Sequence, residues 1–302
     1  MRSTGSWYEV QTPDFDIFKC RLKGKFKIQG LKTSNPIAVG DKVVFDTAGE
    51  EAGHGVIHEI KARENYIIRK SVHKTAHGHI LAANVDQAVL IATFAFPKTS
   101  LGFIDRFLVT AESFRIPVKL IFNKSDLLDE EEKEEVDLLF ELYNSLGYEC
   151  LYTSFIDGTG MDEFKQLLTD KVSLIAGHSG VGKSSLVNKI APNLNLPTTE
   201  VSTFANKGVH TTTFATMFHL ENNSYIIDSP GIKELGLIDL EKEEICHFFP
   251  EMRERLNQCK YHNCINLNEP KCAVIQAFVD GDIAESRYKS YLSMLDGDDN
   301  RR

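Results

Sequence analysis

A glycine-rich segment at residues 177–184, GHSGVGKS, constrains this chain more than any other feature of its sequence. It follows a short apolar run at residues 172–176 and precedes a helix-compatible segment at residues 185–190. A strand, a glycine-rich turn and a helix in this order are typical of a phosphate-binding P-loop, and a chance glycine-rich turn is a far rarer explanation in this context. The segment therefore predicts that the chain binds a nucleoside triphosphate.

The P-loop pattern also predicts the roles of individual residues in it. Its glycines let successive backbone N–H groups point at phosphate oxygens, and the helix N-terminus adds partial positive charge at the same place. Lys183 would reach the β- and γ-phosphates, and the Ser184 hydroxyl would complete a Mg²⁺ shell. The residues expected around the phosphates are Gly177, His178, Ser179, Gly180, Val181, Gly182, Lys183, Ser184 and Ser185.

A second motif, NKSD at residues 123–126, follows the apolar run 118–122. The carboxyl ends of parallel strands form the ligand-binding edge of an open α/β sheet. At this edge Asp126 can accept two hydrogen bonds from guanine. Adenine offers no such pair of donors, so the motif disfavours an ATPase or a kinase. Alone, these four residues are often only a strand-to-helix turn, but together with a P-loop they predict guanine-nucleotide binding.

Residues near this motif would complete the base site. Asn123 would brace the loop and reach the base, and the Lys124 stem would lie across the ring. An acidic run at residues 130–135 opens the next helix, where negative charge suits the helix dipole. The strand expected at residues 150–154 then brings three more residues near the base, which are Thr153, Ser154 and Phe155.

A third motif, DSPG at residues 228–231, ends another apolar run. Asp228 would support Mg²⁺, usually through water, and the Gly231 N–H would sense the γ-phosphate. One threonine of residues 211–213 would supply a hydroxyl to Mg²⁺ in the triphosphate state, with Thr212 as our candidate. All the elements of a guanine-nucleotide site are present, but the base motif precedes the P-loop, so their order is rotated relative to most small GTPases.

The first 70 or so residues have the pattern of short strands. Residues 18–28 alternate between apolar and polar side chains, and further strands are expected at residues 39–45 and 55–60. Five short strands in such a length predict a small barrel, with an OB-fold as the natural candidate. One strand face would carry five cations. A solvated face, or one that protects a sheet edge from aggregation, would explain them, but contact with an RNA backbone is favoured. These cations are Lys19, Arg21, Lys23, Lys25 and Lys27.

Three cysteines within 14 residues follow the pattern Cys259-x4-Cys264-x7-Cys272. In a chain with no sign of secretion, this spacing favours zinc over three buried thiols without a metal. A closed site of four protein ligands would make such a zinc structural. The flanking segments 242–257 and 274–295 are predicted to be helices that the metal would join.

Composition limits the remaining possibilities. The chain has 302 residues, 42% hydrophobic and 25% charged, which is ordinary for a soluble protein of two or three domains. Residues 1–10 contain no apolar secretory region, and the most apolar window, 88–96, is too short to span a bilayer. We therefore expect a cytoplasmic protein with no membrane partner. Residues 71–84 contain three histidines but no Cys or carboxylate, so they predict a linker rather than a metal site.

Taken together, these motifs resemble the circularly permuted GTPases of the ribosome small-subunit-dependent GTPase A family over nearly the whole chain. The resemblance implies three domains, which are an OB-fold at residues 1–72, a permuted α/β P-loop GTPase domain at 73–234 and an α-helical zinc-binding domain at 235–302. It implies a monomer that hydrolyses GTP to GDP with Mg²⁺, carries one structural Zn²⁺ and contacts the rRNA of the small ribosomal subunit. It also implies a role in late maturation of that subunit, with hydrolysis stimulated by it.

The chain departs from the family pattern at a few positions. Asn266 stands where the family has a histidine after the second cysteine, so we take His262 as the fourth zinc ligand, with His247 as an outside candidate. Ile232 stands where small GTPases often have a water-orienting glutamine. His210 is then the candidate for positioning water, although it could equally pack against RNA or protein. Val209 replaces an arginine of the family.

Two functions remain open from the sequence. The first is a GTP-hydrolysing assembly factor whose nucleotide state controls its binding to the small subunit. The second is a guanine-nucleotide-dependent RNA-binding module in which hydrolysis is incidental. The chain runs from residues 228–231 straight into the cysteine-containing part through residues 233–240, so the first function would make this segment the joint between nucleotide and C-terminal domain.

Overall fold

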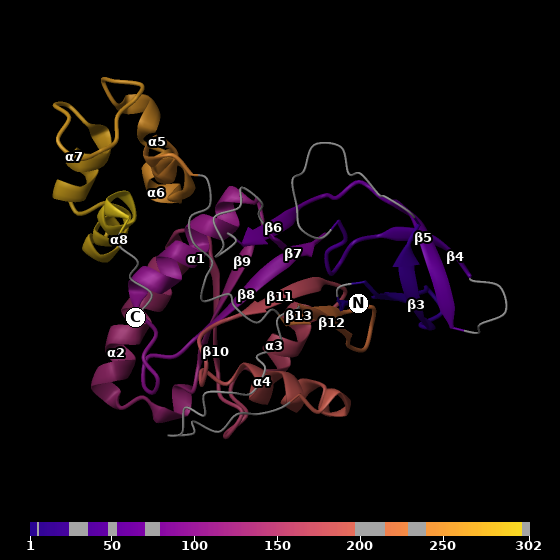
Figure 1. The fold of residues 1–302 in the computed structure, drawn as a ribbon. Helices are drawn as coiled ribbons and strands as arrows, with labels where there is room; N and C mark the ends of the chain where they lie inside the picture. The colour runs from indigo at the N-terminus through magenta and orange to yellow at the C-terminus, as the bar shows by residue number, and fades with distance from the viewer. Residues whose placement is uncertain are drawn as a thin grey trace, which may run out of the picture. The chain divides into compact units, whose positions relative to one another are not determined.

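The computed structural model describes residues 1–4, 6–23, 36–47, 53–69, 79–196, 215–228 and 240–297 (Figure 1). The chain forms two compact units. The first contains the described residues of Met1–Val89, Asp162–Ala176 and Lys183–Leu235, and the second contains those of Leu90–Met161, Gly177–Gly182 and Gly236–Arg302. In the part of the chain that is described, no helix combines the length and the apolar character needed to cross a membrane.

The first unit begins with the expected β-barrel of the OB type. Strand β3 pairs antiparallel with β2 and parallel with β5, and β5 pairs antiparallel with β4. Side chains from successive strands meet inside, where Tyr8, Cys20, Ile37 and Ile57 form a buried apolar cluster. The strands are β1 (Arg2–Ser3), β2 (Tyr8–Gln11), β3 (Ile17–Leu22), β4 (Val43–Thr47) and β5 (His54–Ile60).

Strand β3 has the alternation that the sequence predicts. Cys20 is fully buried, whereas Lys19, Arg21 and Lys23 are exposed. The guanidinium carbon of Arg21 lies 3.8 Å from the centre of the Trp7 ring, a cation–π distance. The last two cations of the predicted row, Lys25 and Lys27, lie outside the described residues.

Two expectations for this region were wrong in detail. The strand expected from residue 39 begins only at Val43, because Gly40 turns the chain at φ +90°, where a Cβ would lie 2.0 Å from the Ala83 oxygen. Part of the expected linker 71–84 is also a strand. β7 (His79–Ala83) pairs antiparallel with β6 (Tyr66–Arg69), and its residues Ile80 to Ala83 are buried and apolar.

The rest of the first unit is a mixed sheet with two helices. β11 (Val172–Ala176) pairs parallel with β13 (Tyr225–Asp228), and β13 pairs antiparallel with β12 (Thr216–His219). The sheet continues into β1, because Arg2 pairs with Thr216 and the Met217 N–H donates to the Met1 carbonyl over 2.8 Å. The helices are α3 (Met161–Leu168), whose first residue belongs to the second unit, and α4 (Lys183–Ile190).

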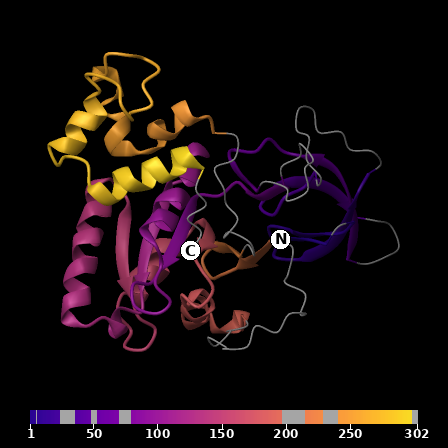
Figure 2. The same ribbon diagram turned by 60° about the vertical axis from the view of Figure 1, so that its left-hand side comes forward.

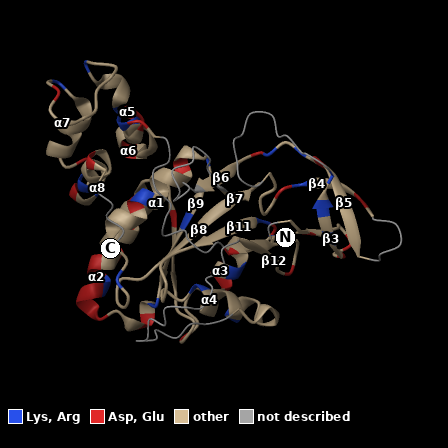
Figure 3. Cartoon of the chain, viewed as in Figure 1, with Lys and Arg blue, Asp and Glu red and all other residues tan. Residues whose placement is uncertain are grey.

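The second unit contains strands in the order β10-β9-β8 and the helices around them. These elements are β8 (Gln87–Ala92), which enters from the first unit, α1 (Leu101–Ser113), β9 (Val118–Asn123), α2 (Glu130–Ser145) and β10 (Glu149–Thr153). The acidic run gathers at the first turn of α2 (Figure 3). Asp129 and Glu132 form a capping box there, so the negative charge stabilises the helix N-terminus as predicted.

The two long helices expected near the C-terminus are both interrupted: the first is divided into two α-helices and two short 3₁₀ helices, and the second into two α-helices. Pro250 begins α6 after an extended Phe249, because a residue before proline avoids the helical conformation. Gly281, at φ +85°, follows the end of α7. The helices are α5 (Lys242–Ile245), α6 (Pro250–Arg253), α7 (Ala273–Val279) and α8 (Glu285–Asp296). Within this unit α8 packs against α1 (Figures 1 and 2).

Candidate functional site

Asn123 connects the base motif to the P-loop within the second unit. It is the last residue of β9, where it lies opposite Thr153 of β10 in the parallel register, and it is buried. Its Nδ2 donates to the Val181 carbonyl over 2.7 Å, and its Oδ1 accepts from the Thr153 hydroxyl over 2.9 Å. The NKSD asparagine is therefore held on both sides, and it fixes the P-loop backbone to the carboxyl ends of two strands.

Two glycines of the P-loop occupy places that no side chain fits. Gly177 has φ +141°, and a Cβ there would lie 2.3 Å from the Ile91 carbonyl oxygen. Gly182 has φ +92°, and a Cβ there would lie 2.5 Å from the Asn123 Nδ2. The chain thus approaches β8 and β9 at distances that only glycine permits, as the P-loop pattern requires.

The other P-loop residues of the second unit are positioned by burial, by backbone conformation and by a ring contact. Val181 is fully buried, and Gly180 has φ +84°. The His178 ring lies on the Phe103 ring of α1, with 3.9 Å between their centres and 34° between their planes. Sequence reasoning placed His178 at the phosphates but missed this contact, which the helical position of Phe103 alone does not reveal.

Lys124 and Asp126 follow the strand in a sharp turn. Lys124 is in the left-handed conformation, φ 62° and ψ 40°, and its Nζ donates to the Phe96 carbonyl over 2.7 Å. Burial lowers the pKa of Lys124, and the nearby Asp126 carboxylate acts in the opposite direction. Asp126 itself lies in a short 3₁₀ helix, Ser125–Leu127, and is exposed. The Lys124 side chain is held at its Nζ, which suits a stem that covers the base. The Asp126 carboxylate beside it is exposed, which suits a group that accepts hydrogen bonds from the base.

The turn after β10 contributes the three other predicted residues. Thr153 and Ser154 are fully buried, and Phe155 is 38% exposed. The Ser154 hydroxyl accepts from the backbone N–H of Ile156 over 3.1 Å, so it shapes its own turn. The Ser125 hydroxyl donates to the Thr153 carbonyl over 3.3 Å, which ties this turn to the NKSD loop. The second unit therefore brings the NKSD loop, the β10 turn and residues 177–182 together.

The first unit contains the lysine predicted to bind phosphate, Lys183, and the carboxylate predicted to support the metal, Asp228. Lys183 is the first residue of α4, with Ser184 and Ser185 half-buried in the same turn. Asp228 is the last residue of β13, opposite Ile175 of β11. Burial raises the pKa of Asp228, and the positive charge of Lys183 counteracts this effect. The two side chains are therefore near enough to interact electrostatically. Three predicted residues, His210, Thr212 and Gly231, lie outside the described residues.

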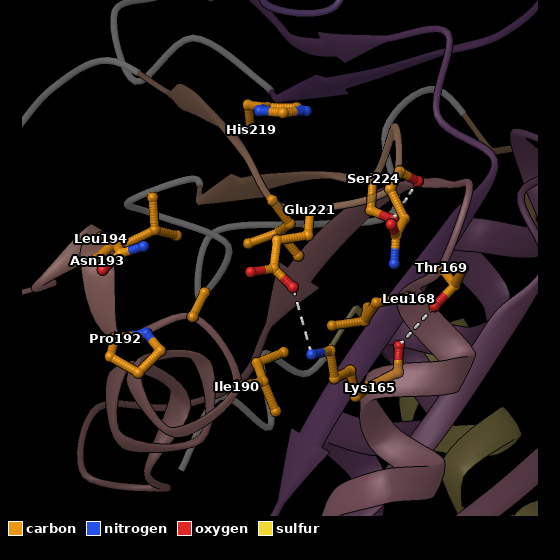
Figure 4. A pocket seen from close by; sticks show the side chains of 13 residues that line it. Lys165, Leu168, Thr169, Ile190, Pro192, Asn193, Leu194, His219, Glu221 and Ser224 are labelled. Carbon is orange, nitrogen blue, oxygen red and sulfur yellow. Dashed lines mark hydrogen bonds and ion pairs between the residues drawn. The ribbon is translucent and has the colours of Figure 1, made fainter.

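A cavity of about 230 Å³ in the first unit lies elsewhere (Figure 4). Its walls come from the ends of α3 and α4 and from the turn between β12 and β13. The Lys165 Nζ lies 3.4 Å from the Glu221 Oε2 across it, in an ion pair between two exposed side chains. Its lining contains none of the residues predicted to bind nucleotide, so we assign it no part in that site.

The three cysteines of the C-terminal part come together. The Cys259, Cys264 and Cys272 sulfurs all lie within 4.8 Å of one another, and the Cys259 and Cys272 sulfurs are 3.9 Å apart. Tetrahedral zinc holds thiolates at about 2.3 Å, which places two sulfurs about 3.8 Å apart, so this donor set fits zinc. His262, predicted as the fourth ligand, is exposed and lies outside the group, because the turn directs it to solvent. His247 is also exposed.

Two buried residues beside the cysteine group were not predicted to be there. Asn266, in the place expected for a histidine, is fully buried, and its Oδ1 lies 3.3 Å from the Cys272 sulfur. Cys246 is 1% exposed, and burial raises its pKa to about 11. Sequence reasoning missed Cys246 because it is 13 residues before Cys259; only the fact that it is a further cysteine in the same part of the chain could have suggested it.

Family models match most of the chain. The model described as RsgA GTPase matches residues 60–238, and the model described as RsgA N-terminal domain matches residues 1–57. A relative from Christiangramia forsetii, named small ribosomal subunit biogenesis GTPase RsgA, is 52% identical over 99% of this chain and 95% of its own. A relative from Bacteroides thetaiotaomicron, named small ribosomal subunit biogenesis GTPase RsgA 2, is 49% identical over 98% of this chain and 95% of its own.

Solved structures have the same fold. The crystal structure of YjeQ from Thermotoga maritima aligns with a TM-score of 0.78 and 36% identity, over 99% of this chain and 96% of that one. The structure of YloQ, described as a circularly permuted GTPase, aligns with a TM-score of 0.73 and 29% identity, over 99% of this chain and 93% of that one. These likenesses confirm what the rotated motif order predicted, and the chain belongs to the RsgA GTPase family, with the fold of a circularly permuted GTPase.

Proposed function

We propose that this protein hydrolyses GTP to GDP and phosphate and acts in late maturation of the small ribosomal subunit, which stimulates the hydrolysis. The names of relatives that are about 50% identical over the full chain support the biological role. The observation that carries the chemistry is the 2.7 Å hydrogen bond from Asn123 to the Val181 carbonyl. It couples the loop that would read the base to the loop that would hold the phosphates.

In this proposal the base is recognised through Asp126. Its carboxylate accepts from the guanine N1–H and the exocyclic amine, while the Lys124 stem covers one face of the ring. The exposure of Asp126 and the anchoring of the Lys124 Nζ on the Phe96 carbonyl support these roles. Asn123, Thr153, Ser154 and Phe155 complete the base site.

The phosphates are held by the P-loop. The backbone N–H groups of residues 177–182 surround the phosphate oxygens, and Lys183 neutralises charge at the β- and γ-phosphates as it develops in the transition state. Ser184, Thr212 and Asp228 would hold Mg²⁺, which would neutralise further charge on the phosphates. The electrostatic proximity of Lys183 and Asp228 supports this assignment. Gly231 senses the γ-phosphate, and His210 orients the attacking water.

The C-terminal part binds one structural zinc ion. Three thiol donors within 4.8 Å of one another are a set that soft, sulfur-preferring Zn²⁺ favours over Mg²⁺ or Ca²⁺. The sulfurs join the turn that begins at Cys259 to the start of α7, where Cys272 caps the helix by accepting from the Ile275 N–H. Zinc here would stabilise the fold rather than take part in hydrolysis.

We further propose three domains, with the barrel at residues 1–72, the GTPase domain at 73–234 and the zinc-binding domain at 235–302. The two family-model ranges support an N-terminal domain followed by a GTPase domain, although they meet between residues 57 and 60; the second range ends at residue 238, close to the second boundary. The barrel contacts rRNA through Lys19, Arg21, Lys23, Lys25 and Lys27, and the protein acts as a monomer in the cytoplasm. Exposure of the first three cations supports the RNA contact.

The decisive experiment measures GTP turnover by the full chain with and without purified small ribosomal subunits. We expect a strong rise in kcat with small subunits and none with an equal amount of large subunits. If neither kind of subunit changes the turnover, the assembly-factor role is contradicted and an RNA-binding module with incidental hydrolysis is favoured. In a parallel binding assay, a non-hydrolysable GTP analogue should give tighter binding to the small subunit than GDP does.

A further inference from the structure

The histidine predicted as the fourth zinc ligand does not lie beside the three clustered thiols. A closed structural zinc site has four protein donors, drawn from cysteine, histidine or carboxylate side chains. His262 and His247 are both exposed, and neither belongs to the group of Cys259, Cys264 and Cys272. Among the residues that the structure describes, the candidates for the fourth donor are therefore those buried against the cluster.

Cys246 is one such residue. It begins a short 3₁₀ helix, Cys246–Phe248, directly after α5, and its side chain is 1% exposed. It belongs to the same buried cluster of side chains as Cys264 and Cys272. Its neighbour His247 faces solvent, so this turn directs the thiol inward and the imidazole outward.

Asn266 lies near both the cysteine group and Cys246. Its side chain is fully buried, with its Oδ1 3.3 Å from the Cys272 sulfur and 4.0 Å from the Cys259 sulfur. The Cys246 Sγ itself donates to the Glu243 carbonyl over 3.4 Å, while Asn266 and Cys259 both lie near enough to Cys246 to affect its pKa. One amide thus contacts two of the cysteine sulfurs and lies near Cys246, which belongs to the same buried cluster as Cys264 and Cys272.

Asn266 is the competing donor, but its chemistry is less suitable. Its amide oxygen is a hard, neutral ligand of the kind that Ca²⁺ prefers, whereas structural zinc takes thiolate sulfur and imidazole nitrogen. An amide that contacts metal ligands without binding the metal is instead a common kind of outer-shell group, which orients those ligands. Its Nδ2 already lies 3.5 Å from the Tyr291 hydroxyl oxygen, which holds it at the edge of the centre.

We propose that Cys246 is the fourth zinc ligand, so that the site is Cys246, Cys259, Cys264 and Cys272, with Asn266 as a positioning residue. The Cys246 thiol is not among the three sulfurs within 4.8 Å of one another. Zinc binding therefore draws it inward, in exchange for its hydrogen bond to the Glu243 carbonyl. This inference rests on the metal site of the proposed function and goes beyond it in naming the ligand set.

X-ray absorption at the zinc edge tests the ligand set on the unaltered full chain, purified under reducing conditions. We expect one zinc per chain with four sulfurs at about 2.3 Å. A shell of three sulfurs with one oxygen or nitrogen at about 2.0–2.1 Å would overturn the assignment of Cys246 while leaving the zinc site itself intact. Absence of zinc from the protein would overturn the metal site and this inference together.

Three variants provide an independent test through zinc affinity, measured by competition with a chromophoric chelator. Cys246→Ser should weaken binding by at least about 100-fold, since even outer-shell changes cost 10–100-fold. Cys150→Ser is the matched control, because Cys150 is a buried thiol on β10 outside the cluster. Its affinity should be unchanged.

Asn266→Gly removes the competing amide and keeps the left-handed backbone, φ 55°, that glycine tolerates. It should bind zinc with four sulfurs and lose at most the 10–100-fold expected for an outer-shell group. An affinity loss larger for Asn266→Gly than for Cys246→Ser would make Asn266 the ligand and refute the proposal.

Discussion

Arg287 of α8 donates from its Nη1 to the Asp105 Oδ1 of α1 over 2.7 Å, and both side chains are fully buried. The same guanidinium donates to both carboxylate oxygens of Glu251 in α6, over 2.7 and 3.1 Å. The Tyr143 hydroxyl of α2 completes the network by donating to Asp105 over 2.8 Å. One buried cation thus joins the C-terminal helices to two helices of the GTPase fold.

This network connects the C-terminal helices to α1 and α2, a connection that the sequence did not suggest. We expected the joint at residues 233–240, after the DSPG motif, and that segment lies outside the described residues. Arg287 and Asp105 are 182 positions apart, and each occurs in a segment whose pattern indicates only an ordinary amphipathic helix. Burial alone would lower the pKa of Arg287, but the two carboxylates outweigh it and raise the pKa above its ordinary value, so the guanidinium remains charged at any physiological pH.

Arg287→Ala should lower the free energy of unfolding by about 3–5 kcal/mol, because it leaves two buried carboxylates without their cation. Chemical denaturation of the full chain measures the change. Lys289→Ala is the matched control on the same helix, because Lys289 forms an exposed pair with Glu285 that contributes little to stability. Equal effects of the two variants would show that the buried network contributes no more than a surface pair.

Asp126→Asn should weaken GTP binding by about 3–6 kcal/mol, since it removes two hydrogen bonds to a charged acceptor. Xanthine nucleotide should bind the variant better than GTP does, because its C2 oxygen can accept from the new amide. Calorimetric titration with both nucleotides measures this reversal. The control Asp129→Asn makes the same change three residues on, where asparagine still caps α2. Unaltered GTP affinity in Asp126→Asn would refute the base assignment.

Lys183→Ala should reduce GTP turnover at least about 100-fold, because it removes a positive charge from the place where negative charge develops. Ser184→Ala should have a similar effect through Mg²⁺. Neither side chain belongs to the apolar core, so circular dichroism and the unfolding midpoint should change little. Lys189→Ala, at the exposed far end of α4, is the control and should hydrolyse GTP normally. Near-normal turnover by both active-site variants would rule out the P-loop assignment.

Local motifs made the nucleotide site predictable. The P-loop and the NKSD motif each require a fixed spacing and a fixed backbone, so the glycine at position 182 and the asparagine at position 123 could be assigned before any contact between them was known. The contact itself, 2.7 Å from Asn123 to the Val181 carbonyl, joins segments 58 residues apart. Such a distance depends on the packing of the sheet, which no local pattern encodes.

The C-terminal part was harder to predict for two physical reasons. Proline at position 250 and glycine at position 281 interrupt helices whose apolar periodicity continues past them, and periodicity alone predicted one helix in each case. The inward direction of Cys246 is a property of the turn after α5, so spacing to the next cysteine does not reveal it. A buried asparagine at position 266 could not be distinguished from a surface loop residue.

The last prediction concerns RNA binding by the exposed cations in and directly after β3. Replacing Lys19 and Lys23 by Gln should weaken binding to the small subunit in the GDP and the triphosphate states by a similar factor, because RNA binding by the barrel is independent of the nucleotide. The slope of log K against log salt should fall by about 2, one for each phosphate that the variant no longer neutralises. Replacing Lys42 and Lys61 by Gln is the control, since it removes the same charge from other exposed barrel positions. If both double variants bind equally weakly, net charge alone explains the effect; if the Lys19 and Lys23 variant binds normally, the β3 face is only solvated.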